Sequence, residues 1–127
     1  MKIDHINISA PRTVLDEEKK FFCEIMGLKE GFRPAFSSNG YWLYNDEQAI
    51  IHLVESERHF ASDKQGYFDH VAFQMEGAER FISKLIRSNV AHQVKFVPKT
   101  TTTQVFVRTP AGIRLEANFK NEEVNTE

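Results

Sequence analysis

The chain has 127 residues, of which 41% are hydrophobic and 27% charged, as is usual for one soluble globular domain. A net charge of −2 without a basic face does not favour nucleic-acid binding, and no apolar run is long enough to span a membrane. The single cysteine, Cys23, excludes an internal disulfide, and no signal-peptide core is present, so we expect a cytoplasmic protein.

Hydrophobic periodicity and turn residues predict the same order of elements twice. In the first module, over about residues 2–55, we expect a strand (2–9), a helix (13–26) and strands at 28–36, 41–44 and 49–55. In the second, over about 67–119, we expect a strand (67–75), a helix (77–89) and strands at 91–97, 102–108 and 113–119. Polar residues 56–66 form the predicted linker, and residues 120–127 a polar tail. The predicted fold class is therefore α+β, with two βαβββ modules and a mostly antiparallel sheet in a single domain over 1–127.

Local signals mark the ends of the first helix. Pro11 is expected to end the first strand, and Thr13 followed by Asp16 resembles a capping box at the start of the helix. Gly27 is a suitable C-terminal stop, because glycine readily adopts positive φ.

A short motif occurs once in each module. Asp4-His5 lies in Ile-Asp-His-Ile-Asn-Ile, and Asp69-His70 lies in Phe-Asp-His-Val-Ala-Phe, so the two histidines are 65 residues apart. His52 on the last strand of the first module and Glu116 on the last strand of the second keep nearly the same step. Each module thus offers one potential metal ligand on its first strand and one on its last.

Strand alternation places these four side chains on a common face. The apolar residues of the four strands should pack on the helices: Ile6, Ile8, Ile51, Leu53, Val71, Phe73, Met75, Leu115, Ala117 and Phe119. The opposite face carries the four candidate ligands together with Asn7, Gln74 and Arg114, which are candidates for substrate binding. Arg114 is expected to pair with Glu116 or to contact an anionic substrate.

Three imidazoles and one carboxylate suit a borderline divalent cation such as Zn²⁺, Ni²⁺, Fe²⁺ or Mn²⁺. The alternative is four unrelated polar residues in strands, and the duplicated positions favour the metal. Asp4 and Asp69 point to the other face by alternation and are interpreted as structural. His59 is placed in the solvated linker, His92 on the surface, and Cys23 is not favoured as a nucleophile. Aromatic side chains that would line a pocket, or equally a core or a dimer interface, are Phe36, Tyr41, Trp42, Tyr44 and Phe106.

Over residues 2–119 the sequence resembles the vicinal oxygen chelate superfamily, which includes glyoxalase I, bleomycin-resistance proteins and extradiol dioxygenases. The motifs that carry this resemblance are Asp-His-Ile-Asn-Ile (4–8), Gly27-Leu28, Asp-His-Val-Ala-Phe (69–73) and Thr-Pro-Ala-Gly-Ile-Arg-Leu-Glu (109–116). The resemblance implies a curved sheet, one divalent metal ion per site, and a homodimer. It implies His5, His52, His70 and Glu116 as the four metal ligands.

Members of the superfamily differ at the position of His52. Glyoxalase I proteins usually carry glutamate there, whereas extradiol dioxygenases and fosfomycin-resistance transferases use a His, His, Glu set that His5, His70 and Glu116 alone would supply. His52 is then a fourth ligand or a neighbour of the ligands. In a glyoxalase-like reaction Glu116 is the only carboxylate of the set and would be ligand, base or both.

The resemblance implies a metal-dependent enzyme acting on a small metabolite that chelates the metal through oxygens. A glyoxalase-like lyase or isomerase and a ring-cleaving-type dioxygenase both fit this description. The alternative is a non-catalytic protein of the bleomycin-resistance type that binds a drug or metabolite. A structural metal with no open coordination position is a third hypothesis.

Overall fold

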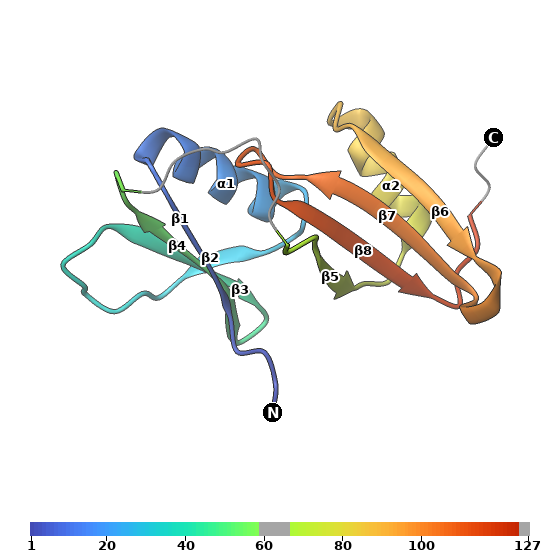
Figure 1. The fold of residues 1–127 in the computed structure, drawn as a ribbon, viewed down its shortest axis with the longest axis horizontal. Helices are drawn as coiled ribbons and strands as arrows, with labels where there is room; N and C mark the ends of the chain where they lie inside the picture. The colour runs from blue at the N-terminus through green and yellow to red at the C-terminus, as the bar shows by residue number, and fades with distance from the viewer. Residues whose placement is uncertain (59–66, 125–127) are drawn as a thin grey trace. The chain divides into compact units, whose positions relative to one another are not determined.

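A computed structural model describes residues 1–58 and 67–124 (Figure 1). The chain divides into two compact units, Met1–Asp63 and Lys64–Glu127, and the division falls between the two predicted modules. Residues 59–66, which include His59 and most of the predicted linker, and residues 125–127 of the predicted tail lie outside the described residues. Neither described helix has the length and hydrophobicity that crossing a membrane requires.

Both units repeat one topology, in which the first strand lies beside the last. The elements of the first unit are β1 (Ile6–Ala10), α1 (Arg12–Glu24), β2 (Lys29–Gly31), β3 (Gly40–Asn45) and β4 (Gln48–Glu55). Those of the second are β5 (Val71–Gln74), α2 (Ala78–Arg87), β6 (His92–Val97), a 3₁₀ turn (Pro98–Thr100), β7 (Thr102–Arg108) and β8 (Arg114–Lys120). The strand orders are β1-β4-β3-β2 and β5-β8-β7-β6, which confirms the predicted βαβββ repeat.

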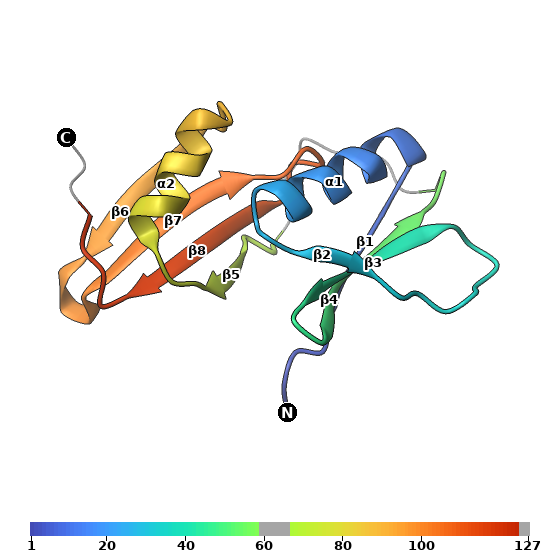
Figure 2. The same cartoon turned by 180° about the vertical axis from the view of Figure 1, so that it is seen from behind.

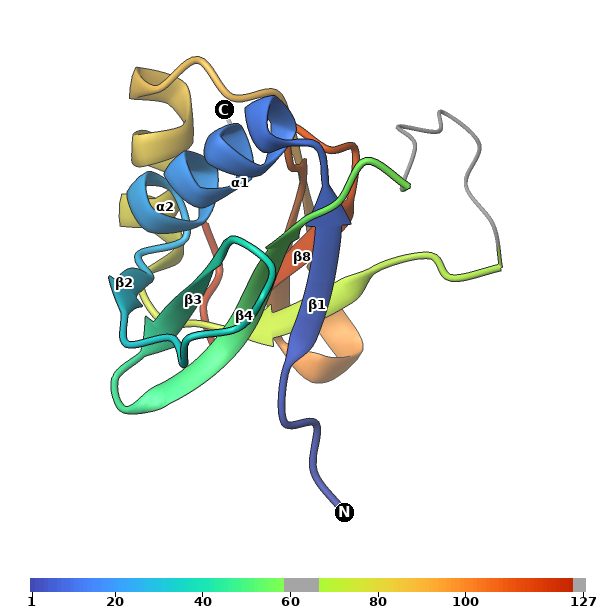
Figure 3. The same ribbon diagram turned by 90° about the vertical axis from the view of Figure 1, so that its left-hand side faces the viewer.

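In each sheet the first and last strands pair in parallel, and the other pairs are antiparallel. Figure 3 shows β1 alongside β4, and Figure 2 shows α2 lying across one face of its sheet. A parallel pair needs a crossover connection. In each unit the helix begins this crossover, because it links the first strand at one edge of the sheet to the second strand at the opposite edge. This connection fixes which side chains of the first and last strands become neighbours.

Three predicted strands are shorter in the structure. The first begins at Ile6 rather than residue 2, the second covers Lys29–Gly31 rather than 28–36, and the fifth covers Val71–Gln74 rather than 67–75. The second strand stops early because Arg33 folds back, donating from Nη1 to the Ser38 backbone oxygen at 2.9 Å and from Nη2 to Ser38 Oγ at 3.2 Å. Pro34 next to it has no N–H for a sheet ladder.

The ends of α1 follow one prediction and contradict another. Pro11 is the N-cap and no side chain caps the helix, so the expected Thr13–Asp16 capping box is wrong. Asp16 instead accepts a hydrogen bond from the Tyr41 hydroxyl at 2.7 Å. Gly27 has φ +79°, which confirms it as the residue where the chain leaves the helix.

The face that packs on each helix is apolar, as strand alternation predicts. In the first unit α1 contacts β1, β3 and β4, and the buried side chains of these strands are Ile8, Ala10, Leu43, Ile51 and Leu53. In the second unit Phe81 of α2 packs on Phe119 of β8 with ring centroids 5.7 Å apart. Leu115 and Ala117 are buried on the same face of β8. The opposite faces are therefore left for polar side chains.

The segment after β8 is fastened to the start of α2 by one glutamate. Glu122 accepts hydrogen bonds from the backbone N–H of Gly77 at 3.0 Å and of Ala78 at 2.8 Å, one on each carboxylate oxygen. The Thr103 hydroxyl donates to the backbone oxygen of Glu122 and holds the same segment against β7. A carboxylate at this position satisfies N–H groups at the helix start and interacts favourably with the helix dipole.

We therefore expect Glu122→Ala to lower the free energy of unfolding by about 1–2 kcal/mol, since it removes a side-chain cap. Urea denaturation measures this change. Glu123→Ala is the matched control because Glu123 is exposed and adjacent, and it should change stability by less than about 0.5 kcal/mol. Equal effects of the two substitutions would contradict a capping role for Glu122.

Candidate metal centre

Strand register brings the candidate ligands together in pairs, one pair in each unit. In the parallel pairing of β5 with β8, Ala72 lies opposite Glu116, and in that of β1 with β4, Asn7 lies opposite His52. His70 and His5 stand immediately before β5 and β1. The structure thus places His70 beside Glu116 and His5 beside His52.

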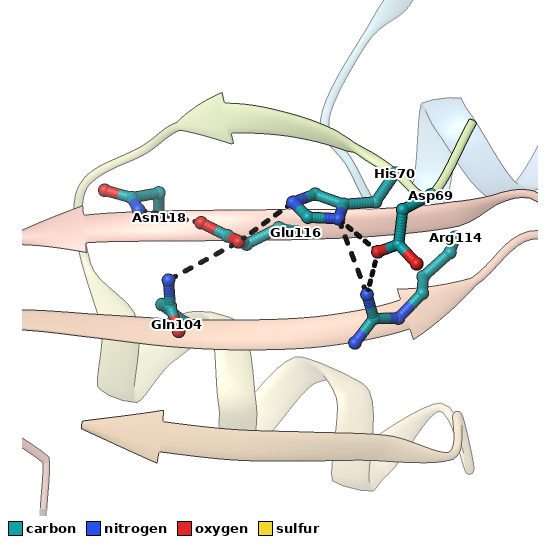
Figure 4. Close-up of polar contacts among 6 residues, drawn as sticks. All are labelled: Asp69, His70, Gln104, Arg114, Glu116 and Asn118. Atoms are coloured by element: carbon teal, nitrogen blue, oxygen red, sulfur yellow. Dashed lines mark hydrogen bonds and ion pairs between the residues drawn. The ribbon is translucent and has the colours of Figure 1, made fainter. Parts of the chain in front are cut away.

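In the second unit the two candidate ligands face each other. His70 Nε2 lies 3.4 Å from Glu116 Oε1 (Figure 4). The Glu116 side chain is only 6% exposed, and Asn118 Nδ2 donates to its Oε2 at 2.8 Å. Gln104 Nε2 lies 3.5 Å from Oε1. The carboxylate is therefore held in one orientation on the polar face of the sheet.

The other side of the His70 ring is bound by Asp69. Asp69 Oδ2 lies 2.6 Å from His70 Nδ1 and 2.6 Å from Arg114 Nη1. A carboxylate only accepts, so this contact assigns a ring proton to Nδ1, and in the neutral imidazole the lone pair is then on Nε2. The hydrogen bond from His70 and then the charge of Arg114 lower the pKa of Asp69, so Asp69 is ionised at neutral pH.

The arrangement of His70 and Glu116 fits a bound cation. An Nε2 lone pair and a carboxylate oxygen that face each other repel unless a proton or a cation lies between them. Two donors each about 2.1 Å from one ion, at a tetrahedral angle, are about 3.4 Å apart, as these two atoms are. A metal-binding histidine commonly donates its other ring N–H to a carboxylate, as His70 does to Asp69.

The first unit repeats the Asp–His contact but not the facing ligands. Asp4 Oδ2 lies 2.7 Å from His5 Nδ1. The His5 ring stacks on His52 with centroids 3.8 Å apart, and Trp42 stacks on the other side of His52 at 4.0 Å. His52 Nε2 lies 3.1 Å from the backbone oxygen of Ala49. Burial and the neighbouring His5 lower the pKa of His52, which keeps it neutral at pH 7.

Parallel stacking has a consequence for metal binding. The His5 and His52 planes are inclined by only 10°, so their in-plane lone pairs run side by side and do not meet at one ion. Within residues 1–58 and 67–124, no group of three or more His, Cys, Asp or Glu side chains gathers to hold a metal. The four-ligand set of His5, His52, His70 and Glu116 stays a prediction.

Asp4 and Asp69 are expected to point to the other face and to orient backbone or helix ends, but the structure gives them a different partner. Each binds the ring of the histidine that follows it, at 2.7 Å and 2.6 Å. The signal that identifies them was present in the sequence, because the Asp-His pair occurs in both modules. Arg114 pairs with Asp69, rather than with Glu116 as one expectation had it.

Two aromatic residues also occupy equivalent positions beside the candidate ligands. Trp42 lies opposite His52 in the β3–β4 pairing, and Phe106 lies opposite Glu116 in the β7–β8 pairing. Phe106 also meets the His70 ring edge-on, with centroids 6.0 Å apart. Their separation of 64 residues equals that of His52 and Glu116, a signal that the sequence offered.

The remaining candidates have local partners. Asn7 donates to Ser9 Oγ at 3.1 Å, and Gln74 is exposed on β5 opposite Asn118, so their role in substrate binding stays a prediction. His92 Nδ1 lies 2.8 Å from the backbone oxygen of Val90. Burial raises the pKa of the Cys23 thiol, which disfavours the thiolate that a nucleophile needs.

No protein-family model matches the sequence, and no curated protein matches it. Solved structures do match the fold. A glyoxylase/bleomycin resistance protein/dioxygenase domain from Frankia sp. has a TM-score of 0.76 at 18% identity, covering 98% of this chain and 95% of that one. A glyoxalase family protein from Enterococcus faecalis has a TM-score of 0.67 at 22% identity, covering 92% and 96%. The genomically encoded fosfomycin resistance protein FosX from Listeria monocytogenes has a TM-score of 0.68 at 14% identity, covering 98% and 95%. The chain therefore has the fold of the vicinal oxygen chelate superfamily, built from two βαβββ modules.

Proposed function

We propose that this chain is a divalent-metal-dependent enzyme acting on a small metabolite that chelates the metal through oxygens. The observation that carries the proposal is the pair of His70 Nε2 and Glu116 Oε1, facing each other at 3.4 Å with the His70 ring held by Asp69. His5, held by Asp4 in the same way, is the third proposed ligand.

The choice of ion class has support from a protein of the same fold. A variant of FosX from Listeria monocytogenes has been solved with Mn(II) and 1S,2S-dihydroxypropylphosphonic acid, and matches this chain with a TM-score of 0.65 at 13% identity. Imidazole and carboxylate donors also suit Zn²⁺, Ni²⁺ and Fe²⁺. A bound divalent ion would stabilise negative charge that develops on a substrate oxygen.

The chain's own residues have separate parts in this proposal. Glu116 supplies one carboxylate oxygen to the ion, and its orientation is held by Asn118 and Gln104. In a glyoxalase-like reaction Glu116, as the only carboxylate of the set, would be ligand, base or both. Asn7, Gln74 and Arg114 lie on the polar strand faces and are proposed to contact the substrate.

His52 does not share the arrangement of the other proposed ligands. Its Nε2 lies 3.1 Å from Ala49 O and its ring is stacked between His5 and Trp42, so binding an ion would require the stack to open. This favours His5, His70 and Glu116, the His, His, Glu set that the resemblance to dioxygenase-like and fosfomycin-resistance proteins implies. A homodimer, the commonest soluble assembly, is the proposed state of the protein.

Metal analysis of the purified protein tests the proposal. We expect stoichiometric divalent metal in the wild type and nearly none in His70→Ala or Glu116→Ala, because each removes a donor. His92→Ala is the matched control, since His92 binds only a local backbone oxygen among the described residues. Equal metal content in all four proteins would contradict the site.

A second prediction concerns His52. We expect His52→Phe to keep stoichiometric metal, because the phenyl ring preserves the stack with Trp42 while removing both ring nitrogens. His5→Ala, measured beside it, should lose the metal. If His52→Phe loses metal to the same extent as His5→Ala, His52 is a fourth ligand.

Activity assays separate the reaction classes. We expect metal-dependent turnover in one of two assays, isomerisation of a hemithioacetal or oxygen uptake with a catechol, with loss on chelation and recovery when metal is restored. No turnover in either, together with ligand binding that survives a chelator, would instead identify a binding protein.

A further inference from the structure

The two Asp–His pairs differ in one partner. Asp69 contacts both His70 and Arg114 through the same oxygen, Oδ2, at 2.6 Å each. In the described part of the chain, the Asp4 carboxylate forms its hydrogen bond and ion pair with His5 and has no arginine beside it. The residue that occupies the position of Arg114 in the first module, 64 residues earlier, is Ile50, which has no donor.

Arg114 is itself held in place. Its guanidinium carbon lies 4.3 Å from the centre of the Phe106 ring, within range of a cation–π interaction. Arg114 is the first residue of β8, and in the backbone register of the β7–β8 pair it lies opposite Arg108. In the same register, Phe106 of β7 lies opposite Glu116 of β8. The guanidinium thus lies over the Phe106 ring. It also binds Asp69, as Figure 4 shows.

The side chain that contacts an arginine, Asp69, is less exposed than its counterpart Asp4. The Asp4 side chain is 87% exposed, whereas that of Asp69 is 63% exposed. An exposed aspartate samples several rotamers in solution, and only one of them accepts a hydrogen bond from the neighbouring ring. A second bond from a fixed arginine restricts Asp69 to the rotamer that binds His70.

We propose that Arg114 is a positioning residue, which holds Asp69 and through it fixes the Nδ1–H form and the orientation of His70. The Nε2 lone pair of His70 is then directed at Glu116 before any ligand binds. The consequence for metal affinity rests on the proposed function, whereas the state of the His70 ring does not depend on it.

One effect opposes this role. Arg114 and His70 share one acceptor oxygen, and the positive charge of the guanidinium draws electron density from it, which weakens the His70 hydrogen bond. Arg114 Nη1 and His70 Nδ1 lie 3.4 Å apart and are both donors, so they do not bond to each other. We expect the restriction of the Asp69 rotamer to outweigh the sharing of its oxygen.

Nitrogen-15 NMR of the histidine rings, in the metal-free protein at about pH 8 where imidazole is neutral, reports the tautomer directly. We expect the His70 ring in the wild type to be Nδ1–H, and more completely so than His5, which serves as an internal reference. Arg114→Met keeps an apolar stem over Phe106 and should shift His70 toward a mixture of tautomers. Arg114→Lys retains a cation and should restore most of the wild-type signal. Arg108→Met changes the residue opposite Arg114 on β7 and should leave the tautomer of His70 unchanged.

An unchanged His70 tautomer in Arg114→Met, or equal tautomer populations of His5 and His70 in the wild type, would overturn the inference. Asp69→Ala shows the effect of removing the hydrogen bond itself and should change the His70 ring most.

A metal titration of the same proteins separates the inference from the proposed function. We expect the dissociation constant to rise about 10- to 100-fold in Asp69→Ala and about tenfold in Arg114→Met. Absence of metal binding in the wild type would refute the proposed function while the tautomer result stands. Tight binding in the wild type with no tautomer change in Arg114→Met would refute the inference alone.

Discussion

The parallel pairing of the first strand with the last strand of each module is the constraint on which the candidate site depends. It sets Ala72 opposite Glu116 and Asn7 opposite His52. His70 therefore lies beside Glu116, and His5 lies beside His52. Because the side-chain period of a strand is two, a shift of one residue would move Glu116 to the apolar face that packs on α2. Burial of Leu115, Ala117 and Phe119 on that face opposes such a shift.

The same topology yields two different local arrangements. In the second unit a lone pair and a carboxylate oxygen face each other, an arrangement that a cation stabilises. In the first unit the equivalent positions hold a stack of two imidazoles and an indole, which is stable without an ion. The second unit therefore has two facing donors at these positions, whereas the first unit has packed rings. This difference is why the second unit supports the proposed function more directly.

Much of the fold followed from the sequence, because it depends on signals that a sequence displays. The βαβββ repeat came from the duplicated Asp-His motif and from apolar periodicity, and both helices lie within a few residues of their expected ranges. The alternation rule failed for Asp4 and Asp69 for a definite reason. His5 and His70 stand just before the first residues of β1 and β5, Ile6 and Val71, so the pleat does not govern the residues before them. The early end of β2 depends on the return of Arg33 to Ser38, which no periodicity reveals.

The position of the only tryptophan gives the protein a built-in optical signal. The indole of Trp42 stacks on the imidazole of His52 with ring centroids 4.0 Å apart, and a protonated imidazole at that distance quenches indole fluorescence. Intrinsic fluorescence therefore reports the state of the His52–Trp42 stack without any added label. Any event that separates these two rings or charges the imidazole therefore changes the emission.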